Sequence, residues 1–332
     1  MGKAYQALVV RRDGKRTFKS AIETRTTDDL PVGDVLIRVH YSSINYKDCL
    51  SCQGHPAITR RFPHTPGIDA AGIVEASGDS RFDEGDAVIV FSHAMGMTIP
   101  GGFGQFVRVQ ADWVMPLPNT MPLEEAMAYG TAGYTAALSV EAILGAGVRP
   151  EESKAVVSGA TGGLGGIAVG MLADLGFHVT ALTGKVDEAR DFLMNLGASE
   201  VRDRREVEDN TGRNILVPIW NAAIDVAGGN LLSTLIKATA DNGVVIATGM
   251  VQDTAFATTV LPFILRGVRL IGINAESTSM DRRKAVWAAM ATTRKPKNFA
   301  DLYTVVRLTD LPEAVEGIAS GAYLGRVVVD MR

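Results

Sequence analysis

The N-terminal part of the chain alternates short apolar runs with turn residues. The runs lie at residues 7–10, 35–39, 67–74, 87–91 and 103–109. Runs of this length that are bounded by Gly, Pro and Asp predict β-strands. Pro31, Gly33 and Asp34, for example, predict a turn before the second run. The pattern favours a small β-barrel or sandwich over residues 1–120.

The pattern changes at Pro122. Apolar positions over residues 123–144 recur at helical spacing, and Glu124 and Glu125 fall in the first predicted turn. Strands and helices then alternate, with strands at 155–158, 179–182, 223–225, 244–248 and 268–273 and helices at 165–175, 187–196 and 231–239. This alternation predicts a parallel sheet with helices on both faces, and therefore an α/β fold class.

The pattern in the C-terminal tail, residues 280–332, predicts two more helices and two more strands. Its last strand, 325–330, has no obvious place in the α/β unit, so we expect it to return to the first domain. The chain has 332 residues, whereas one domain usually holds about 100–200. Two domains are therefore expected.

Composition narrows the class of protein. Hydrophobic residues make up 46% and charged residues 21%, which is typical of a globular protein rather than a disordered one. The formal net charge of −4 gives no domain-wide basic excess for nucleic acid or an anionic membrane. No signal peptide and no apolar stretch near the ~20 residues of a membrane span is visible. We expect a soluble, cytoplasmic protein.

The most informative segment is the glycine-rich run at residues 156–166. It follows a predicted strand and opens a predicted helix, with Thr161, Gly162, Gly163 and Leu164 at its centre. In this context a dinucleotide is the expected ligand, because glycines let the backbone approach the pyrophosphate and the helix N-terminus supplies free N–H groups. The alternative is a turn with a structural role only.

The next strand indicates which nicotinamide cofactor binds. NAD sites usually place Asp or Glu about 20 residues past the glycines. Here Thr183, Gly184 and Lys185 follow the strand instead. A hydroxyl, a glycine backbone and an ammonium suit a 2′-phosphate, which favours NADPH. Arg204 follows the next strand, and its planar guanidinium can donate two parallel hydrogen bonds to the same phosphate. The alternative for Lys185 and Arg204 is a solvated surface position.

Six stretches carry a resemblance to a known family. They are the glycine-rich run and residues 41–48, 66–72, 130–136, 262–266 and 325–326. The chain resembles the zinc-independent medium-chain dehydrogenases/reductases of the quinone oxidoreductase branch. More narrowly, it is similar to the NADPH-dependent acryloyl-CoA reductases. The Asn-Tyr-Lys-Asp sequence at 45–48 and the Pro-Phe-Ile-Leu-Arg sequence at 262–266 are the most specific to this narrower group.

The resemblance implies a domain plan. Residues 1–126 and 274–332 would form a GroES-like β-barrel catalytic domain, and residues 127–273 a Rossmann NADPH-binding domain inserted into it. The active site would lie in the cleft between the two. A homodimer through the edge strand at 268–273 is also implied.

Zinc-dependent members of this family bind catalytic zinc through a Cys and a Gly-His-Glu segment. By the resemblance, Asn45 and residues 67–69 stand at the corresponding positions of this sequence, and the side chain of Ile68 cannot bind a metal. Two cysteines also cannot build a four-cysteine site. Cys49 and Cys52 have the spacing of a metal or redox pair, but unpaired cysteines on a helix are favoured. We therefore expect no metal.

The resemblance also implies roles for residues near the nicotinamide. Asn45 and Tyr46 are the predicted catalytic residues, because a developing enolate oxygen needs a hydrogen-bond donor and the α-carbon needs a proton. The alternative for Tyr46 is a packing contact with the ribose, with water as the proton donor. Thr131 resembles the nicotinamide-side hydroxyl of the family, and its alternative is a helix-start residue.

Further segments resemble those that line the cofactor. They contribute Gly249, Met250, Phe263, Leu265, Asn274 and Arg326 to the predicted cofactor site, with packing as the alternative. The loop at residues 93–102, rich in Gly and Met, predicts an adaptable lip at the substrate site. Within this loop, we expect His93 to have a packing or surface role rather than that of a general base. Arginines at 60–61 and basic residues at 282–284 are candidates for contacts with CoA phosphates.

The favoured function is NADPH-dependent reduction of the C=C bond of acryloyl-CoA to propionyl-CoA. A second hypothesis is an NADPH:quinone or general enone oxidoreductase. A third hypothesis is a non-catalytic NADPH-binding protein, against which the intact Asn45–Tyr46 segment argues. Both enzyme readings share every predicted cofactor residue, so the cofactor motif does not separate them.

Overall fold

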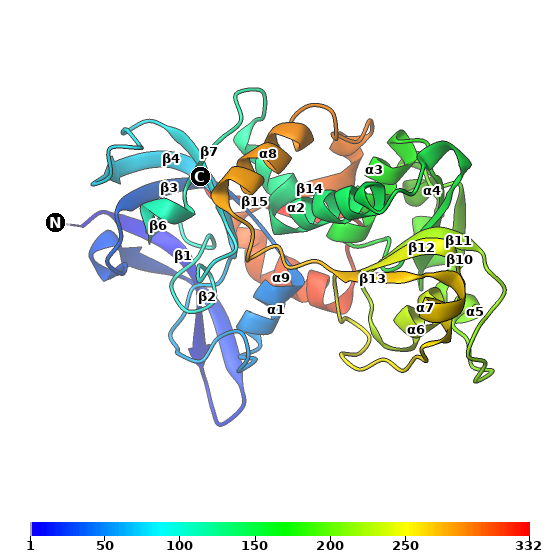
Figure 1. The fold of residues 1–332 in the computed structure, drawn as a ribbon. Helices are drawn as coiled ribbons and strands as arrows, with labels where there is room; N and C mark the ends of the chain where they lie inside the picture. Colours follow the sequence, from blue (N-terminus) through cyan, green and yellow to red (C-terminus); the bar gives the residue numbers. More distant parts are fainter. Residues whose placement is uncertain (1) are drawn as a thin grey trace. The chain divides into compact units, whose positions relative to one another are not determined.

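A computed structural model describes residues 2–332 of the chain, which fold into two compact units (Figure 1). Unit 1 contains the chain up to Thr131 together with Thr278–Ala291 and Tyr303–Arg332. Unit 2 contains Ala132–Ser277 and Thr292–Leu302. Among the described residues, no helix is both long and apolar enough to cross a lipid bilayer.

Unit 1 is built mainly from β-strands. An antiparallel pair, β1 (Ala4–Arg12) and β2 (Phe18–Thr26), accompanies a seven-stranded sheet. The order of that sheet is β14 (Tyr303–Arg307), β15 (Arg326–Asp330), β3 (Val35–Ser43), β4 (Asp69–Ser77), β5 (Ala87–Phe91) and β7 (Met115–Pro116), and β6 (Phe106–Val109) also pairs with β3. Val39, Val90, Phe103 and Val327 are among the fully buried residues of its core. The strands predicted before residue 110 are all confirmed.

The last strand of the chain belongs to this first sheet. β15 pairs antiparallel with β3, with Val328 opposite Ser43, and parallel with β14. Figure 1 shows β15 in red beside the blue β3. The expected return of residues 325–330 to the first domain is therefore confirmed.

Unit 1 also contains helices. They are α1 (Tyr46–Cys52), the start of α2 (Leu123–Gly145), α8 (Met280–Met290) and α9 (Leu311–Ser320), with short 3₁₀ turns η1 (Thr27–Asp29), η2 (Ala111–Trp113) and η5 (Leu308–Asp310). Of these helices, α1 connects β3 to β4 and α9 connects β14 to β15. The α2 helix is interrupted at Gly130, whose φ of 50° and ψ of −152° are not helical. At this break the backbone N–H of Thr131 donates to the carboxylate of Asp69, a contact of the site described below.

Unit 2 contains a parallel six-stranded sheet in the order β10-β9-β8-β11-β12-β13. Its strands are β8 (Lys154–Val157), β9 (His178–Thr183), β10 (Glu200–Asp203), β11 (Trp220–Asp225), β12 (Thr239–Ala247) and β13 (Arg269–Gly272). Its helices are the rest of α2, then α3 (Gly163–Asp174), α4 (Val186–Asn195), α5 (Arg204–Val207), α6 (Gly229–Lys237) and α7 (Leu261–Arg266), with η3 (Pro150–Glu152) and η4 (Phe299–Leu302). In chain order the strands run 3-2-1-4-5-6, as in doubly wound dinucleotide-binding folds. The predicted α/β fold class is confirmed.

Candidate active site

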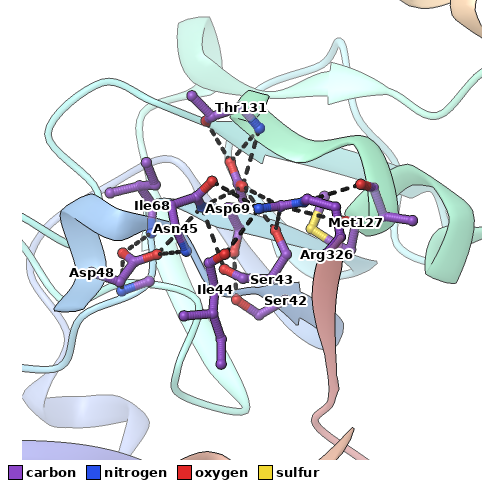
Figure 2. Close-up of polar contacts among 12 residues, drawn as sticks. Ser42, Ser43, Ile44, Asn45, Asp48, Ile68, Asp69, Met127, Thr131 and Arg326 are labelled. Carbon is purple, nitrogen blue, oxygen red and sulfur yellow. Dashed lines mark hydrogen bonds and ion pairs between the residues drawn. The ribbon is translucent and has the colours of Figure 1, made fainter. Parts of the chain in front are cut away.

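Asn45 begins α1 and is held there by its own hydrogen bonds (Figure 2). Its backbone N–H donates to Asp48 Oδ2 over 2.8 Å, which completes a capping box. Its side-chain Nδ2 donates to Asp69 Oδ2 over 2.7 Å and to Asp48 Oδ2 over 3.3 Å. The amide oxygen accepts from Arg326 Nη1 over 3.1 Å. Both amide N–H bonds and the carbonyl therefore have protein partners.

Asp69 lies at the centre of these contacts and is fully buried. Its carboxylate accepts from Ser43 Oγ at 2.8 Å and from Asn45. It also accepts from Thr131, over 2.6 Å from the hydroxyl and over 3.0 Å from the backbone N–H that follows the break at Gly130. Such short hydrogen bonds from several donors are typical of an ionised carboxylate. Asp69 therefore fixes both Asn45 and Thr131.

Arg326 is the counter-charge of Asp69. It is 3% exposed, and its Nη2 lies 3.5 Å from Asp69 Oδ2. Its guanidinium also donates to Ser43 Oγ over 2.6 Å and to backbone carbonyls, which are those of Ile44, Met127 and Ala128. Burial lowers the pKa of Arg326, and the charges of Asp69 and Asp48 oppose that shift. With its donors used inside unit 1, Arg326 is placed to hold Asn45 and Asp69 rather than to bind a phosphate.

Asp48 supports the same region from α1. Its Oδ1 accepts from the backbone N–H groups of Gly67 and Ile68 at 3.1 and 3.0 Å. Burial raises the pKa of Asp48 to about 7, and the nearby charge of Asp69 adds to this, whereas the hydrogen bonds from Asn45 and Ile68 oppose it. Asp48 thus ties the start of α1 to the segment that enters β4.

Asp69 and Asp48 were not among the residues predicted for the site. A signal was present, because Asp69 directly precedes the apolar run at 70–74 and Arg326 directly precedes the run at 327–329. A charge on a buried strand needs a partner of opposite sign. Because residues 325–330 were expected to return to the first domain, an ion pair between Asp69 and Arg326 could have been predicted.

Tyr46 is the first residue of α1 and directly follows Asn45. Its side chain is 45% exposed, whereas Asn45 and Thr131 are only partly exposed. The structure therefore brings Asn45, Tyr46, Thr131 and Arg326 into one region of unit 1. Their predicted roles toward substrate and cofactor stay predictions.

In unit 2 the glycine-rich run forms the turn between β8 and α3. Gly159 has a φ of +58°, and a Cβ on Gly165 would overlap the carbonyl oxygen of Gly159. These two glycines let the helix begin directly against the turn. Gly162 caps α3, while Thr161, Gly163 and Leu164 remain partly exposed. The residues predicted to hold a pyrophosphate thus lie at the N-terminus of α3.

Lys185 and Arg204 lie on neighbouring segments at the ends of β9 and β10. A Cβ on Gly184 would lie 3.5 Å from Arg204 Nε, so the guanidinium lies directly over this glycine. Thr183 is buried, and its Oγ1 accepts from the backbone N–H of Lys185 at 3.1 Å. The neighbouring Arg205 pairs with Asp203, but no described carboxylate pairs with Lys185 or Arg204. The Arg204 guanidinium therefore lies over Gly184, and Lys185 is the next residue in the chain.

The other predicted cofactor residues of unit 2 differ in their surroundings. A Cβ on Gly249 would overlap the backbone of Val226, so this glycine has a packing role. Met250 and Leu265 are 56% and 65% exposed, and Phe263 packs partly against the core of unit 2. Asn274 is exposed, and its Oδ1 accepts from the N–H of Glu276 at 3.0 Å.

Arg266, from the most specific stretch of the resemblance, has a structural role. Its guanidinium donates to the backbone carbonyls of Lys237, Thr239 and Leu216, over 3.1, 3.2 and 2.7 Å. These bonds fasten α7 to the start of β12 and to the loop before β11. This part of the motif is explained by folding rather than by chemistry.

Two expectations about the substrate region are wrong. The loop at 93–102 is not an adaptable lip, because Met95 is fully buried and Gly101 and Gly102 are hydrogen-bonded to Thr65 and Gly67. A Cβ on Gly96, Gly101 or Gly102 would overlap backbone atoms of Gly67 or Asp69, so these three positions are closely packed.

Arg283, a candidate for CoA phosphates, is 1% exposed. It donates to the carbonyl of Phe91 over 3.1 Å and lies 4.5 Å from the centre of that ring. It is therefore a core residue of unit 1, and it is not available to a ligand.

Comparison with known proteins identifies the family. The model of the alcohol dehydrogenase GroES-like domain matches residues 31–119, and that of the zinc-binding dehydrogenases matches residues 163–292. The chain is 44% identical to YhfP of Bacillus subtilis, provisionally named a quinone oxidoreductase, over 93% of this chain and 94% of that protein. The chain belongs to the medium-chain dehydrogenase/reductase family. The GroES-like and Rossmann assignments are thereby confirmed.

Other relatives of this dehydrogenase/reductase cover nearly its full length. The acrylyl-CoA reductase AcuI of Ruegeria pomeroyi is 37% identical over 98% of this chain and 99% of that protein. The solved structure of the Salmonella enterica oxidoreductase yhdH, in complex with NADP, has a TM-score of 0.94 at 37% identity, covering 98% of this chain and 100% of that one. The solved structure of YhfP has NAD bound and a TM-score of 0.94 at 42% identity, covering 99% of each chain.

Although one matching model is named for zinc-binding dehydrogenases, the expected absence of a bound metal stays a prediction for this family member. Residues 2–332 contain no group of three or more His, Cys, Asp or Glu side chains arranged to bind a metal. Ile68 is buried where a ligand was expected in zinc-dependent relatives, and Asn45 is committed to Asp48, Asp69 and Arg326.

We predict that activity does not depend on metal. Extended dialysis against a chelator should leave the rate unchanged, because the polar groups of the site are satisfied by one another. Elemental analysis after purification should find less than one zinc per chain. Stoichiometric zinc whose removal abolishes activity would contradict the prediction.

The Cys49–Cys52 pair is also not suited to redox chemistry. Both thiols are free, and Cys49 Sγ donates to the carbonyl of Val315 on α9 over 3.5 Å. Burial raises the pKa of Cys49 above its usual range and that of Cys52 to about 12. Thiols that remain protonated at neutral pH are poor nucleophiles. The two cysteines therefore serve the packing of α1, as the sequence favoured.

Proposed function

We propose that this chain is an NADPH-dependent reductase of the C=C bond of a small enoyl thioester, with acryloyl-CoA as substrate and propionyl-CoA as product. The observation that carries the cofactor assignment is the Arg204 guanidinium over Gly184, directly beside Lys185 in the chain. The likeness to AcuI supports the substrate assignment.

The residues present fit a dinucleotide with a 2′-phosphate. Thr161, Gly162, Gly163 and Leu164 would hold the pyrophosphate at the start of α3, and Lys185 and Arg204 the 2′-phosphate. We assign this binding to the Rossmann domain, residues 127–273, and substrate binding to the GroES-like domain, residues 1–126 and 274–332. When bound, NADPH supplies the hydride that reduction of an activated C=C bond requires.

The chain itself must stabilise negative charge on the acyl oxygen and deliver a proton to the α-carbon. Asn45 has no N–H left for this task, because both donate to carboxylates. Thr131 directs its hydroxyl proton to Asp69 and so offers a ligand only oxygen lone pairs. Among the predicted residues of unit 1, the exposed Tyr46 is the hydroxyl that remains as a donor. We therefore propose Tyr46 as the catalytic donor, with Asn45 as a positioning residue.

We expect Tyr46→Phe to lower kcat for acryloyl-CoA about tenfold, with little change in NADPH binding. The contact would strengthen only as charge develops in the transition state. A donor in a closed oxyanion site is often worth 10²–10³ in rate, but a half-exposed hydroxyl should be worth less. Steady-state kinetics with acryloyl-CoA, together with NADPH titration, would measure both effects.

Tyr46→Ala is the matched variant. If the ring only packs against the ribose, the Phe variant should have nearly the wild-type kcat and NADPH affinity. The Ala variant should then weaken NADPH binding. A Phe variant with the wild-type rate on acryloyl-CoA would remove Tyr46 from the catalytic role and leave proton delivery to water.

A second candidate function is quinone or enone reduction, and the likeness to YhfP favours it. Incubation of the protein with NADPH and acryloyl-CoA, quinones and enones in parallel separates the two enzymes. A protein that binds NADPH but oxidises it with none of these acceptors would instead support the hypothesis of a non-catalytic NADPH-binding protein.

The homodimer and the cytoplasmic location stay predictions. β13 is the edge strand of the sheet in unit 2, which is the position the resemblance gives to a dimer contact. Its free edge is able to pair with a second copy.

A further inference from the structure

The hairpin between β1 and β2 is unusually basic. Residues 11–19 contain five basic residues and one acidic residue, in a chain whose net charge is −4. Arg11 pairs with Glu23 and Lys19 pairs with Asp13. The other three are exposed, and no carboxylate of the described chain pairs with them: Arg12, Lys15 and Arg16.

A second basic segment lies against this hairpin. Arg60 and Arg61 are exposed in the loop after α1, and residues 53–64 contain no carboxylate. The rings of Phe18 and Phe62 lie 4.7 Å apart, which places the two segments side by side although they are far apart in the sequence. We call Arg12, Lys15, Arg16, Arg60 and Arg61 together the basic surface.

The basic surface concentrates positive charge without neutralising it. Five cations close together on an acidic protein repel one another, and elsewhere in unit 1 exposed arginines such as Arg38 and Arg81 have carboxylate partners. An uncompensated cluster of this kind raises the local concentration of anions. Arginine, which supplies most of the cluster, presents a planar fork that matches phosphate.

The basic surface lies one short helix away from Tyr46. α1 begins at Tyr46 and ends at Cys52, and Gly54, just beyond it, contacts the ring of Phe18. Seven helical residues span about 10 Å. Figure 1 shows α1 leading to the blue hairpin within unit 1. A ligand with its reactive end at Tyr46 and an anionic end on the basic surface must be extended and flexible between the two.

We propose that the basic surface binds the phosphate groups of the CoA part of the substrate, with the pantetheine arm running along α1 to the thioester at Tyr46. This inference rests on the proposed function and deepens it. The half-buried Phe18 and Phe62 add an aromatic surface against which an adenine can stack. Quinones and simple enones carry no phosphates, so the basic surface would distinguish CoA thioesters from them.

The test compares acryloyl-CoA with acryloyl-pantetheine, which lacks the phosphates. Two variants, Arg60→Gln/Arg61→Gln and Lys15→Gln/Arg16→Gln, each remove two charges. Each should raise the KM for acryloyl-CoA roughly five- to tenfold, since exposed contacts to phosphate are partly screened. The KM for acryloyl-pantetheine, the KM for NADPH and kcat should not change. Raising the ionic strength should raise the KM for acryloyl-CoA less in the variants than in the wild type.

The matched control is Arg38→Gln/Arg81→Gln, which removes two charges from ion pairs elsewhere in unit 1. It should leave the KM for acryloyl-CoA within about twofold of the wild type, because net charge alone acts weakly at physiological salt. An equal increase in this control would overturn the proposal in favour of a general charge effect.

Calorimetric titration with free CoA and with dephospho-CoA separates this proposal from the proposed function. If the enzyme does not reduce acryloyl-CoA but binds CoA through the basic surface, the function is wrong and the proposal stands. If CoA binds equally to wild type and variants, the proposal is overturned whatever the activity. Loss of affinity for phosphatidylglycerol vesicles in the variants, with CoA affinity intact, would overturn it in favour of a membrane-binding surface.

Discussion

Asp69→Asn should destabilise the protein by about 3–5 kcal/mol, the usual cost of leaving one partner of a buried ion pair without the other. Asp69 is fully buried and Arg326 is 3% exposed, so water cannot replace the lost charge. Asparagine would also bring an amide N–H toward Ser43 and Thr131, which both donate to the carboxylate. Chemical denaturation of the wild type and the variant would measure the difference.

The reciprocal variant sharpens this test. Arg326→Met alone should be similarly harmful, because it leaves Asp69 as an unpaired buried charge. The double variant Asp69→Asn/Arg326→Met should cost clearly less than the sum of the two, since neither member of this ion pair then remains without the other. Strictly additive costs would show that the two side chains stabilise the fold independently, and the ion pair would then not be the reason for their burial.

An exposed carboxylate provides the control for Asp69. Asp79 pairs with Arg81 at the surface, and Asp79→Asn should shift the melting temperature far less. NADPH titration should also separate the two variants. We expect weaker binding in Asp69→Asn, because Thr131 loses the acceptor that orients its hydroxyl, and no change in Asp79→Asn.

Lys185→Ala should raise the KM for NADPH by roughly one to two decades and leave the KM for NADH almost unchanged. A charge-assisted contact with the 2′-phosphate is worth about 1.5–3 kcal/mol, and NADH has no such group. Arg204→Ala should act in the same direction, since its guanidinium lies over the same glycine, Gly184. Initial rates with each cofactor would measure both constants.

Arg205 is the matched control for this prediction. It is adjacent to Arg204 but is paired with Asp203, so Arg205→Ala should leave the preference for NADPH intact. The comparison is informative because a relative with 42% identity, YhfP, has been solved with NAD bound. An equal loss of affinity for both cofactors in Lys185→Ala would refute the 2′-phosphate assignment.

Regular patterns made most of the fold predictable. All strands before residue 110 except β2, the alternation in unit 2 and the return of the last strand follow from apolar spacing and turn residues. β2 was missed, because its residues are mostly half-buried or exposed and its few apolar positions do not stand out. A strand that is stabilised mainly by pairing with its neighbour leaves little trace in hydrophobicity.

The site was harder to predict than the fold. Motifs located Asn45, Tyr46 and Thr131, but they did not show that Asp69 takes up the hydrogen bonds of two of them. The partners of a buried charge lie far apart in the sequence, so local patterns carry no information about them. Arg283 was misjudged for the same reason, since only the packed structure shows that its charge faces Phe91.

The long separation of Asp69 and Arg326 along the chain also bears on how the protein is made. During synthesis, Asp69 and the strands around it leave the ribosome long before Arg326 does, and domains tend to fold as units while the chain emerges. Until Arg326 arrives, β3 and β4 cannot close over Asp69 without burying a single negative charge. We therefore expect the Rossmann sheet, all of whose strands are complete by Gly272, to form first. Unit 1 would then close only after residue 326 has been synthesised, because Arg326 also holds Asn45 in place.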